Sequence, residues 1–265
     1  MTTFVRQFDY LFNELADPRV ENWPLMKSPG PLFGIIGFYL AVVYVILPAY
    51  MKNRKPYSLK TIIYYYNIFQ VVACTILIYG IATSGWTTEY TFGCQPVDYS
   101  DRPIALRMLS FVYYTFILKV IEMVETVFFL LRKKNNQVSK LHVYHHASTA
   151  LIAWSATKFV GGGMTTFAIL LNSFIHILMY TYYWLSSFGP EMQARLKPWK
   201  PRLTMAQMIQ FCFLLAHSLQ ALEPSCQVAK NFLILYLPNV ILIFYMFWDF
   251  YKTNYLKGKS KKSID

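Results

Sequence analysis

The chain has 265 residues, of which 55% are hydrophobic and 14% are charged, and it carries a net charge of +12. The charged fraction is well below the roughly 25% of soluble domains, and the hydrophobic residues gather in uncharged runs close to the ~20 residues that cross a bilayer core. This composition excludes an ordinary soluble domain. It predicts an all-α integral membrane protein, because runs inside lipid must satisfy their backbone groups internally, as a helix does.

Seven such runs are predicted to be transmembrane helices. They divide the chain into an N-terminal segment (1–30), for which we expect no signal peptide, a seven-helix domain (31–251) and a basic tail (252–265). No repeat and no linker divides the domain further. In chain order the runs are 31–51, 61–88, 108–131, 141–157, 165–187, 203–222 and 231–248.

The basic residues fall mainly on one side of the predicted membrane. The loops 52–60, 132–140 and 195–202, together with the tail, hold seventeen of the 25 Lys and Arg residues. Because positively charged loops stay in the cytosol, we expect a cytosolic C-terminus and a lumenal or external N-terminus. Topology and lipid headgroups explain most of these charges, and attraction of an anionic cytosolic substrate is the alternative. No nucleic-acid partner is expected.

Four cysteines divide into two pairs. Cys94 and Cys226 lie in loops that the charge pattern places on the non-cytosolic side, where an oxidising lumen would allow them to form a disulfide. Two unrelated thiols are the alternative. Cys74 and Cys212 lie inside spans, where we expect packed thiols.

Polar residues inside spans are costly in lipid, so each is a candidate for function. In the third span, "KVIEMVET" places Lys119, Glu122 and Thr126 along one stripe of a helix, with Glu125 about a third of a turn away. An internal Lys–Glu pair that fixes helix packing is the simpler interpretation of Lys119 and Glu122 alone.

The fourth span begins with "KLHVYHHAS", which holds three of the five histidines. His142, His145 and His146 are spaced i, i+3, i+4, so they lie within an arc of about 100° on one helix face. A cluster of this kind could hold a metal, act as a base or nucleophile, or pack. Three histidines on one face make simple packing a poor explanation.

The next two spans add further polar side chains on single faces. The residues that share a face in the fifth span are Asn172, His176, Met179, Tyr180 and Tyr183, and those in the sixth are Thr204, Gln207 and Phe211, with Gln210 beside them. Counted from the basic loops, all these clusters lie in the cytosolic half of the bundle. One cavity could contain them, with a basic mouth and an apolar interior. Such a cavity suits a substrate with an anionic head and a long apolar tail.

The number of histidines helps to decide between a metal site and catalysis by histidine itself. The H-x-x-H-H spacing is typical of membrane di-iron enzymes, and imidazole suits iron, but those sites need about eight histidines and this chain has five. Four histidines and two carboxylates could hold one metal at most. Histidine as a base or nucleophile is therefore favoured, since no G-x-S-x-G motif is present. A seven-helix receptor or transporter is the non-enzymatic alternative.

Four motifs together resemble a known family. "KVIEMVET", "LHVYHH", "NSFIHILMYTYY" and "TMAQMIQF" resemble, in order and spacing, the signature boxes of the very-long-chain fatty acid elongases. The resemblance extends from "ADPRVENWPLMKSP" to the basic tail. It implies a seven-helix protein of the endoplasmic reticulum membrane that condenses long-chain acyl-CoA with malonyl-CoA to 3-oxoacyl-CoA, CO2 and CoA. It also implies that no metal or cofactor is needed, and that two reductases and a dehydratase act as partners. Dimerisation is common in the family, although no segment indicates an interface here.

The chain departs from the family pattern at two places. The first box usually ends in Asp-Thr, and here Glu125-Thr126 lengthens the carboxylate by one methylene. The dilysine retrieval signal is imperfect, with Lys262 fourth from the end and Ser263 third. Gln137 and "ADPRVENWPLM" resemble the branches that handle very-long or polyunsaturated chains.

The resemblance and the spacing together assign roles. We expect His145 to hold the acyl chain as an acyl-imidazole, with its neighbour His146 as the alternative and with a histidine that acts only as a base also open. His146 and His142 would act as base or orienting partner, while His176 and Asn172 would polarise a carbonyl or stabilise the enolate. The supporting residues would be Lys119, Glu122, Glu125, Thr126, Tyr180 and Tyr183, and the CoA-binding residues would be Thr204, Gln207, Gln210, Lys133, Lys134, Arg195, Lys200 and Arg202.

Overall fold

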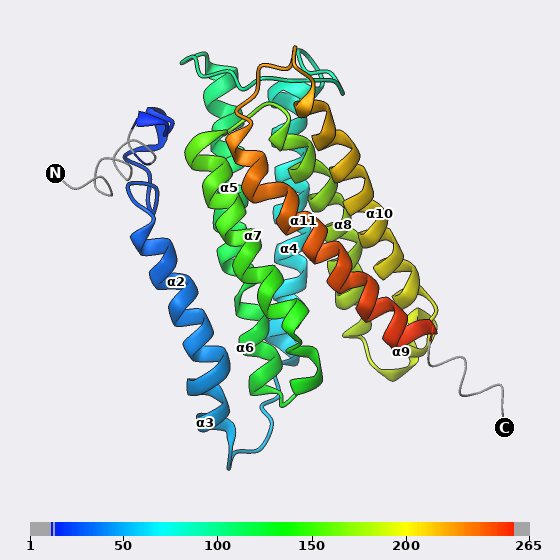
Figure 1. Cartoon of the computed structure of the whole chain (residues 1–265). Helices are drawn as coiled ribbons and strands as arrows, with labels where there is room; N and C mark the ends of the chain where they lie inside the picture. Colours follow the sequence, from blue (N-terminus) through cyan, green and yellow to red (C-terminus); the bar gives the residue numbers. More distant parts are fainter. Residues whose placement is uncertain (1–11, 13, 257–265) are drawn as a thin grey trace.

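The computed structural model describes Phe12 and residues 14–256, which fold into a bundle of long helices without a strand in that part of the chain (Figure 1). The predictions for residues 1–11, for residue 13 and for 257–265, including the Lys262 retrieval signal, lie outside the described residues. The short helix η2 (Pro18–Val20) precedes the long helices, and η5 (Asn135–Gln137) and α9 (Pro190–Leu196) lie between them. The long helical segments are α2, η3 and α3 (Gly30–Ala41, Val42–Ile46, Leu47–Met51), α4 and η4 (Lys60–Ile81, Ala82–Trp86), α5 and α6 (Pro103–Glu122, Val124–Leu131), α7 (Lys140–Phe159), α8 (Thr165–Ser186), α10 and η6 (Trp199–Leu219, Gln220–Leu222), and α11 and η7 (Asn231–Tyr251, Lys252–Leu256).

Six of these segments are long and apolar enough to cross a membrane, so the protein is transmembrane. The helix outside this set is α7, which begins with the histidine cluster. It packs against α5, α11 and α2. A helix surrounded by other helices can carry polar side chains that face protein instead of lipid, which explains why α7 is less apolar than its neighbours.

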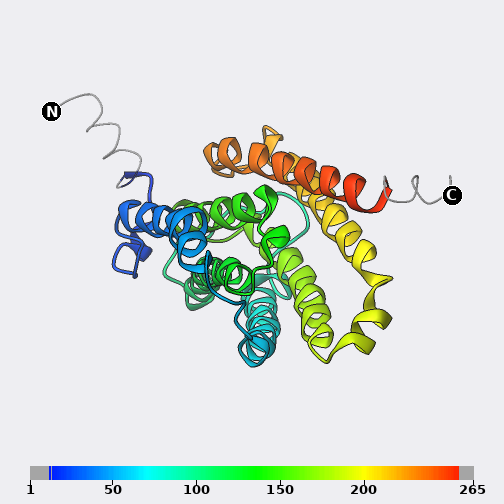
Figure 2. The same ribbon diagram turned by 90° about the horizontal axis from the view of Figure 1, so that it is seen from below.

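The helices run alternately up and down, and this order gathers the basic loops at one end. The loops 52–59, 132–139 and 187–198 lie at the lower end in Figure 1, where η7 also ends. We call this the basic end. The loops 87–102, 160–164 and 223–230 lie at the opposite end. Seen from below, α2 lies at one edge of the bundle, and α10 with α11 lies at the other (Figure 2).

The third predicted span is not one continuous helix. It begins earlier than expected, at Pro103, and it is interrupted at Met123 between α5 and α6. The interruption lies between Glu122 and Glu125. Met123 itself keeps helical dihedrals, with φ −58° and ψ −24°, and the two carboxylates on either side of it contact different partners.

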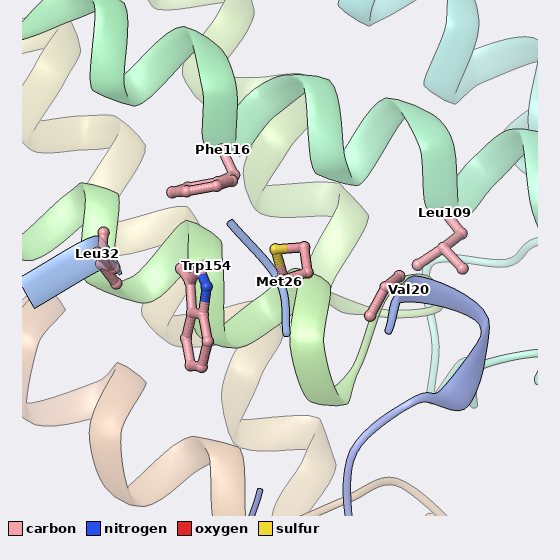
Figure 3. Packing of buried hydrophobic residues seen from close by; sticks show 6 residues of the cluster. All are labelled: Val20, Met26, Leu32, Leu109, Phe116 and Trp154. Carbon is pink, nitrogen blue, oxygen red and sulfur yellow. The ribbon is translucent and has the colours of Figure 1, made fainter. Parts of the chain in front are cut away.

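The N-terminal segment packs across the end opposite the basic one. Val20 and Met26 are fully buried against Leu109 of α5 and Trp154 of α7 (Figure 3). The Trp154 indole also donates a hydrogen bond to the Leu25 carbonyl at 2.8 Å. Residues that precede the first membrane helix thus contribute to the core of the bundle.

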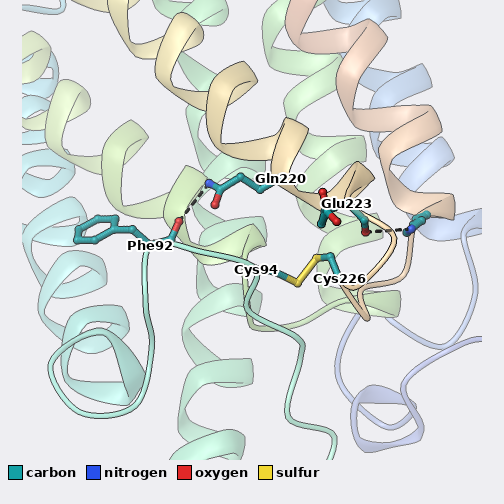
Figure 4. The surroundings of a disulfide bond; sticks show 6 residues. Phe92, Cys94, Gln220, Glu223 and Cys226 are labelled. Carbon is teal, nitrogen blue, oxygen red and sulfur yellow. Dashed lines mark hydrogen bonds between the residues drawn. A yellow bond between two sulfur atoms is a disulfide. The ribbon is translucent and has the colours of Figure 1, made fainter.

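A disulfide joins Cys94 to Cys226, the pairing that the charge pattern predicts, and so links two loops at this end (Figure 4). Beside it, the Gln220 amide donates to the Phe92 carbonyl at 3.1 Å. The expectation for Cys74 is correct, since its thiol is buried, but the expectation for Cys212 is wrong. Cys212 is exposed because it lies on the outward face of α10, where the neighbouring side chains, Ile209 and Phe213, are also exposed.

Candidate active site at the junction of two cavities

A large cavity with a mixed polar and apolar wall lies near the basic end, between α6, α7, α8, α10 and α11. Its empty volume is about 1490 Å³, and we call it the vestibule. All four histidines of the predicted site line it, together with a carboxylate, amides and hydroxyl groups. The predicted residues on its wall are Glu125, His142, His145, His146, Asn172, His176, Tyr180, Tyr183, Lys200, Thr204, Gln207 and Gln210.

A second cavity runs from the histidines toward the opposite end, and we call it the tail cavity. Its empty volume is about 1280 Å³, and most of its wall is aliphatic or aromatic, from residues such as Val112, Ala153 and Leu214. Gln95 and Val228, which lie in the two loops joined by the disulfide, line its far end. The two cavities share four residues, which mark their junction: His145, Asn172, Gln210 and Phe211.

His145 is placed at this junction by the start of α7. The Ser139 side chain caps the helix by accepting a hydrogen bond from the His142 amide at 3.1 Å. The helix begins at Lys140, so His145 lies more than one turn inside it. His145 is the one histidine of the described chain that lines both cavities, and its Nδ1 is buried without a hydrogen-bond partner.

A buried ion pair stands beside the junction on α5. Lys119 Nζ lies 3.0 Å from both carboxylate oxygens of Glu122, and both side chains are almost wholly buried. Glu122 Oε1 is also 3.3 Å from Nδ1 of His176 on α8. The pair therefore connects the third span to a histidine of the fifth, and Lys119 itself lines the tail cavity.

Glu125 is held by hydroxyl groups from two other helices. Tyr180 of α8 and Tyr66 of α4 both donate to its Oε1, Tyr66 at 3.1 Å. Gln70 in turn donates to the Tyr66 hydroxyl at 2.7 Å. The other carboxylate oxygen, Oε2, lies 3.8 Å from His146 Nε2. These contacts fix one oxygen and leave the second facing the histidine cluster.

Thr126 orients the remaining histidine of the cluster. Its hydroxyl lies 3.0 Å from His142 Nε2 and 2.9 Å from the Tyr39 hydroxyl of α2. The ring of His142 stands edge to face with that of His146, with centroids 4.4 Å apart. The three histidines of α7 thus have different surroundings, and His145 has the most direct access to the tail cavity.

Glu125, His142 and His146 also offer ligand atoms that all lie within 4.8 Å of one another, close enough for one metal ion. Two of these side chains have other partners, because His142 faces Thr126 and Glu125 accepts from two tyrosines. This is one candidate group among the described residues, and catalysis without a metal stays a prediction.

The basic residues that were predicted to bind CoA do not all lie at one place. Lys200 lines the vestibule, whereas Lys133 and Lys134 are exposed in the loop after α6. Arg195 pairs with Glu191 at 2.7 Å on α9, and the guanidinium of Arg202 lies over the ring of Trp199. These four residues lie at the basic end, outside the vestibule wall.

Several residues of the site were not predicted from the sequence. Tyr66 donates a hydrogen bond to Glu125, and Gln70 donates one to Tyr66. The sequence signal for both is a short polar series, Tyr66, Asn67 and Gln70, inside a span without charged residues. Further unpredicted residues on the vestibule wall come from the loop before α7, from α8 and from η7. They include Asn136, Gln137, Tyr182, Asn254 and Tyr255.

Comparison with known proteins gives consistent matches over most of the chain. Residues 24–263 match the ELO family, described as the GNS1/SUR4 family. A very long chain fatty acid elongase of Aedes aegypti is 39% identical over 98% of this chain and 73% of that protein. Human very long chain fatty acid elongase 4 is 39% identical over 94% of this chain and 79% of that protein. Rat very long chain fatty acid elongase 7 is 40% identical over 96% of this chain and 91% of that protein.

Proposed function

The chain belongs to the GNS1/SUR4 family of fatty acid elongases, and from this premise we propose that it condenses a long-chain acyl-CoA with malonyl-CoA. The products would be 3-oxoacyl-CoA, CO2 and CoA. Family membership supports an enzyme of fatty acid elongation, and the two cavities support the particular reaction. The vestibule lies toward the basic end and about half of its wall is polar, whereas the wall of the tail cavity is mostly apolar.

The position of His145 carries this proposal. With the acyl chain in the tail cavity and CoA in the vestibule, the thioester carbonyl would lie at their junction. His145, Asn172 and Gln210 are the polar residues that line both cavities. An imidazole can attack the carbonyl there. The amides of Asn172 and Gln210 can donate hydrogen bonds to the oxygen that becomes negatively charged.

The chemistry balances in three steps. Neutral His145 attacks the acyl carbonyl, the carbon–sulfur bond breaks, and the imidazole proton leaves with the thiolate as free CoA. Malonyl-CoA then enters and loses CO2, and the electrons of the broken carbon–carbon bond form a thioester enolate. The enolate carbon attacks the acyl-imidazole and displaces the imidazole, which regains a proton from solvent. The sum consumes one proton for each condensation.

The neighbouring groups orient this histidine and its partners. Glu122, held by Lys119, lies 3.3 Å from His176 and fixes that ring from the α5 side. Glu125 faces His146 at 3.8 Å. In this arrangement His176 and His146 stabilise the charge that develops at the junction, and His145 is the nucleophile. The same condensation with His145 acting only as a base is the second form of the proposal.

The proposal extends to the setting of the enzyme. The alternating helices and the single basic end support seven membrane passages with a lumenal N-terminus and a cytosolic C-terminus in the endoplasmic reticulum. The protein would need no metal or organic cofactor. Its product would pass to a reductase, a dehydratase and a second reductase, and a homodimer remains part of the expectation from the family.

A condensation assay with purified full-length protein tests the function. The protein should convert palmitoyl-CoA and malonyl-CoA to the 3-oxoacyl-CoA, with equal amounts of CO2 and CoA. His145→Ala should abolish the product. The matched control is Ser148→Ala, because Ser148 lies on the same helix, bonds to the His145 carbonyl and lines neither cavity. Full activity of His145→Ala would contradict the assignment of the site.

A further inference from the structure

The tail cavity is not apolar along its whole length. His217, near the end of α10, lines it far from the junction. The side chain is 8% exposed, and its Nε2 atom is buried without a hydrogen-bond partner among the described residues. None of the predicted roles uses this fifth histidine.

The ring of His217 is held in a fixed plane. It stacks on Phe167 of α8 with centroids 4.2 Å apart and an angle of 24° between the rings. Rotation of the imidazole would give up this contact. The stacking fixes the plane of the ring, and His217 is a polar side chain on a wall that is otherwise mostly apolar.

No side chain in the described part of the chain supplies the missing hydrogen bond. The next residue, Ser218, also lines the cavity, but its hydroxyl donates to the Leu214 carbonyl at 2.7 Å. A buried polar atom without a partner is destabilising, and it is normally paired by a protein group, a water molecule or a ligand. A saturated acyl chain that ends in a methyl group cannot pair with it.

The depth of His217 fits the distal part of a bound acyl chain. Gln210 lies at the junction of the cavities, and His217 follows it by seven residues on the same helix, about 10 Å further along the axis. An acyl chain attached at His145 would pass this level in the tail cavity. A hydrogen-bonding group that the chain carried at this level would lie beside the His217 ring.

We propose that His217 binds a hydroxyl group at the distal end of the acyl chain, so that the enzyme elongates ω-hydroxyacyl-CoAs as well as unsubstituted ones. This inference rests on the proposed condensation and concerns which tails the cavity accepts. The hydroxyl is a spectator in the reaction. It hydrogen-bonds to the imidazole edge and takes the place of any water bound there.

Matched pairs of substrates test the proposal. The purified full-length protein is assayed with malonyl-CoA and a length series of saturated acyl-CoAs, each beside the ω-hydroxyacyl-CoA of the same length. The variants are His217→Phe, which keeps an aromatic ring against Phe167 and removes the polar edge, and His217→Gln, which keeps a polar group. Leu219→Ala is the control, since this exposed side chain lies two residues further along α10.

The measured quantity is the ratio of kcat/KM for the hydroxylated chain to that for the unsubstituted chain. At the length whose end reaches His217, the His217→Phe substitution should lower this ratio about tenfold. Elongation of the unsubstituted chain should persist. His217→Gln and Leu219→Ala should keep most of the ratio.

Two results would overturn the inference while leaving the condensation intact. One is elongation of the unsubstituted chains alone by the wild-type protein. The other is a ratio that His217→Phe does not change at any length, as expected if water alone pairs with Nε2. Failure of the wild-type protein to condense any acyl-CoA would instead contradict the proposed function, and the inference with it.

Discussion

The buried pair of Lys119 and Glu122 provides a test of how the bundle holds its active site. In Lys119→Met an apolar side chain fills much of the space of the lysine, and the Glu122 carboxylate loses the ammonium that lies 3.0 Å from both of its oxygens. Glu122 is fully buried, so water does not replace that partner. The substitution therefore leaves an uncompensated charge in the interior.

The cost follows from the surroundings of the pair. Removing one partner of a buried ion pair destabilises a protein by about 3–5 kcal/mol. We expect the lower end, about 3 kcal/mol, because His176 lies 3.3 Å from Glu122 and can offset part of the charge by binding a proton. That loss corresponds to a rise of roughly a hundredfold in the ratio of unfolded to folded protein. Adding Glu122→Leu to Lys119→Met removes both charges and should recover most of the stability.

Unfolding in mixed micelles, followed by tryptophan fluorescence, measures these free energies for the wild type, the single variant and the double variant. The condensation assay is run on the same samples. The double variant should be stable but nearly inactive, because His176 has lost the carboxylate that orients it. Wild-type stability of Lys119→Met, or a double variant as unstable as the single one, would refute this account of the pair.

Three further predictions concern other contacts. Tyr66→Phe leaves Glu125 with one hydroxyl donor instead of two, so kcat should fall about tenfold with little change in KM, as steady-state condensation kinetics would reveal. Cys94→Ser breaks the disulfide and should lower the free energy of unfolding by about 2–5 kcal/mol, and a reductant should destabilise the wild type but not the variant. Hydrogen bonds from Ser100 lower the pKa of Asp98 below its ordinary value of 3.8, so its contribution to stability is present above about pH 4 and is lost as the pH falls through the lowered pKa. Asp98→Asn should remove that dependence, which thermal unfolding between pH 3 and pH 7 would measure. If the wild type and Asp98→Asn show the same slope of unfolding temperature against pH, the reasoning is wrong.

Much of the arrangement could be predicted because helical spacing is a local property. The i, i+3, i+4 spacing of His142, His145 and His146 places them on one face whatever the neighbouring helices do, and all three line the vestibule. Counting residues from the basic loops likewise predicted that several spans contribute to one cavity. The structure brings Asn172, Gln210 and the histidines together from three helices.

The rest depends on packing between helices, which spacing does not determine. Tyr39 is one of 21 tyrosines, and nothing in the local sequence indicates that its hydroxyl reaches Thr126. The polar series that contains Tyr66 indicates a polar face of α4 but does not show that this face meets Glu125. No proline or glycine stands at Met123, so the sequence does not indicate that α5 ends and α6 begins there. The exposed position of Cys212 and the course of the tail cavity to His217 follow from which faces of α10 meet their neighbours.

The charged residues follow the predictions from the sequence only in part, for a similar reason. Lys119 and Glu122 have little choice of partner inside the bundle, and they pair within one helix. The exposed cations of the basic end can turn toward solvent, a neighbouring side chain or a substrate. Lys200 lines the vestibule, whereas Arg195 pairs with Glu191. Sequence position alone therefore located the basic end without identifying which of its cations would reach CoA.

The central claim is that His145 carries the acyl group at the junction of the two cavities. Mass spectrometry of the purified protein after incubation with acyl-CoA alone, without malonyl-CoA, tests it most directly. The account predicts an acyl adduct on the peptide that contains His145, together with an equal amount of free CoA, and loss of both in His145→Ala. An intact protein with no adduct and no CoA release, despite full condensation once malonyl-CoA is added, would contradict the covalent mechanism.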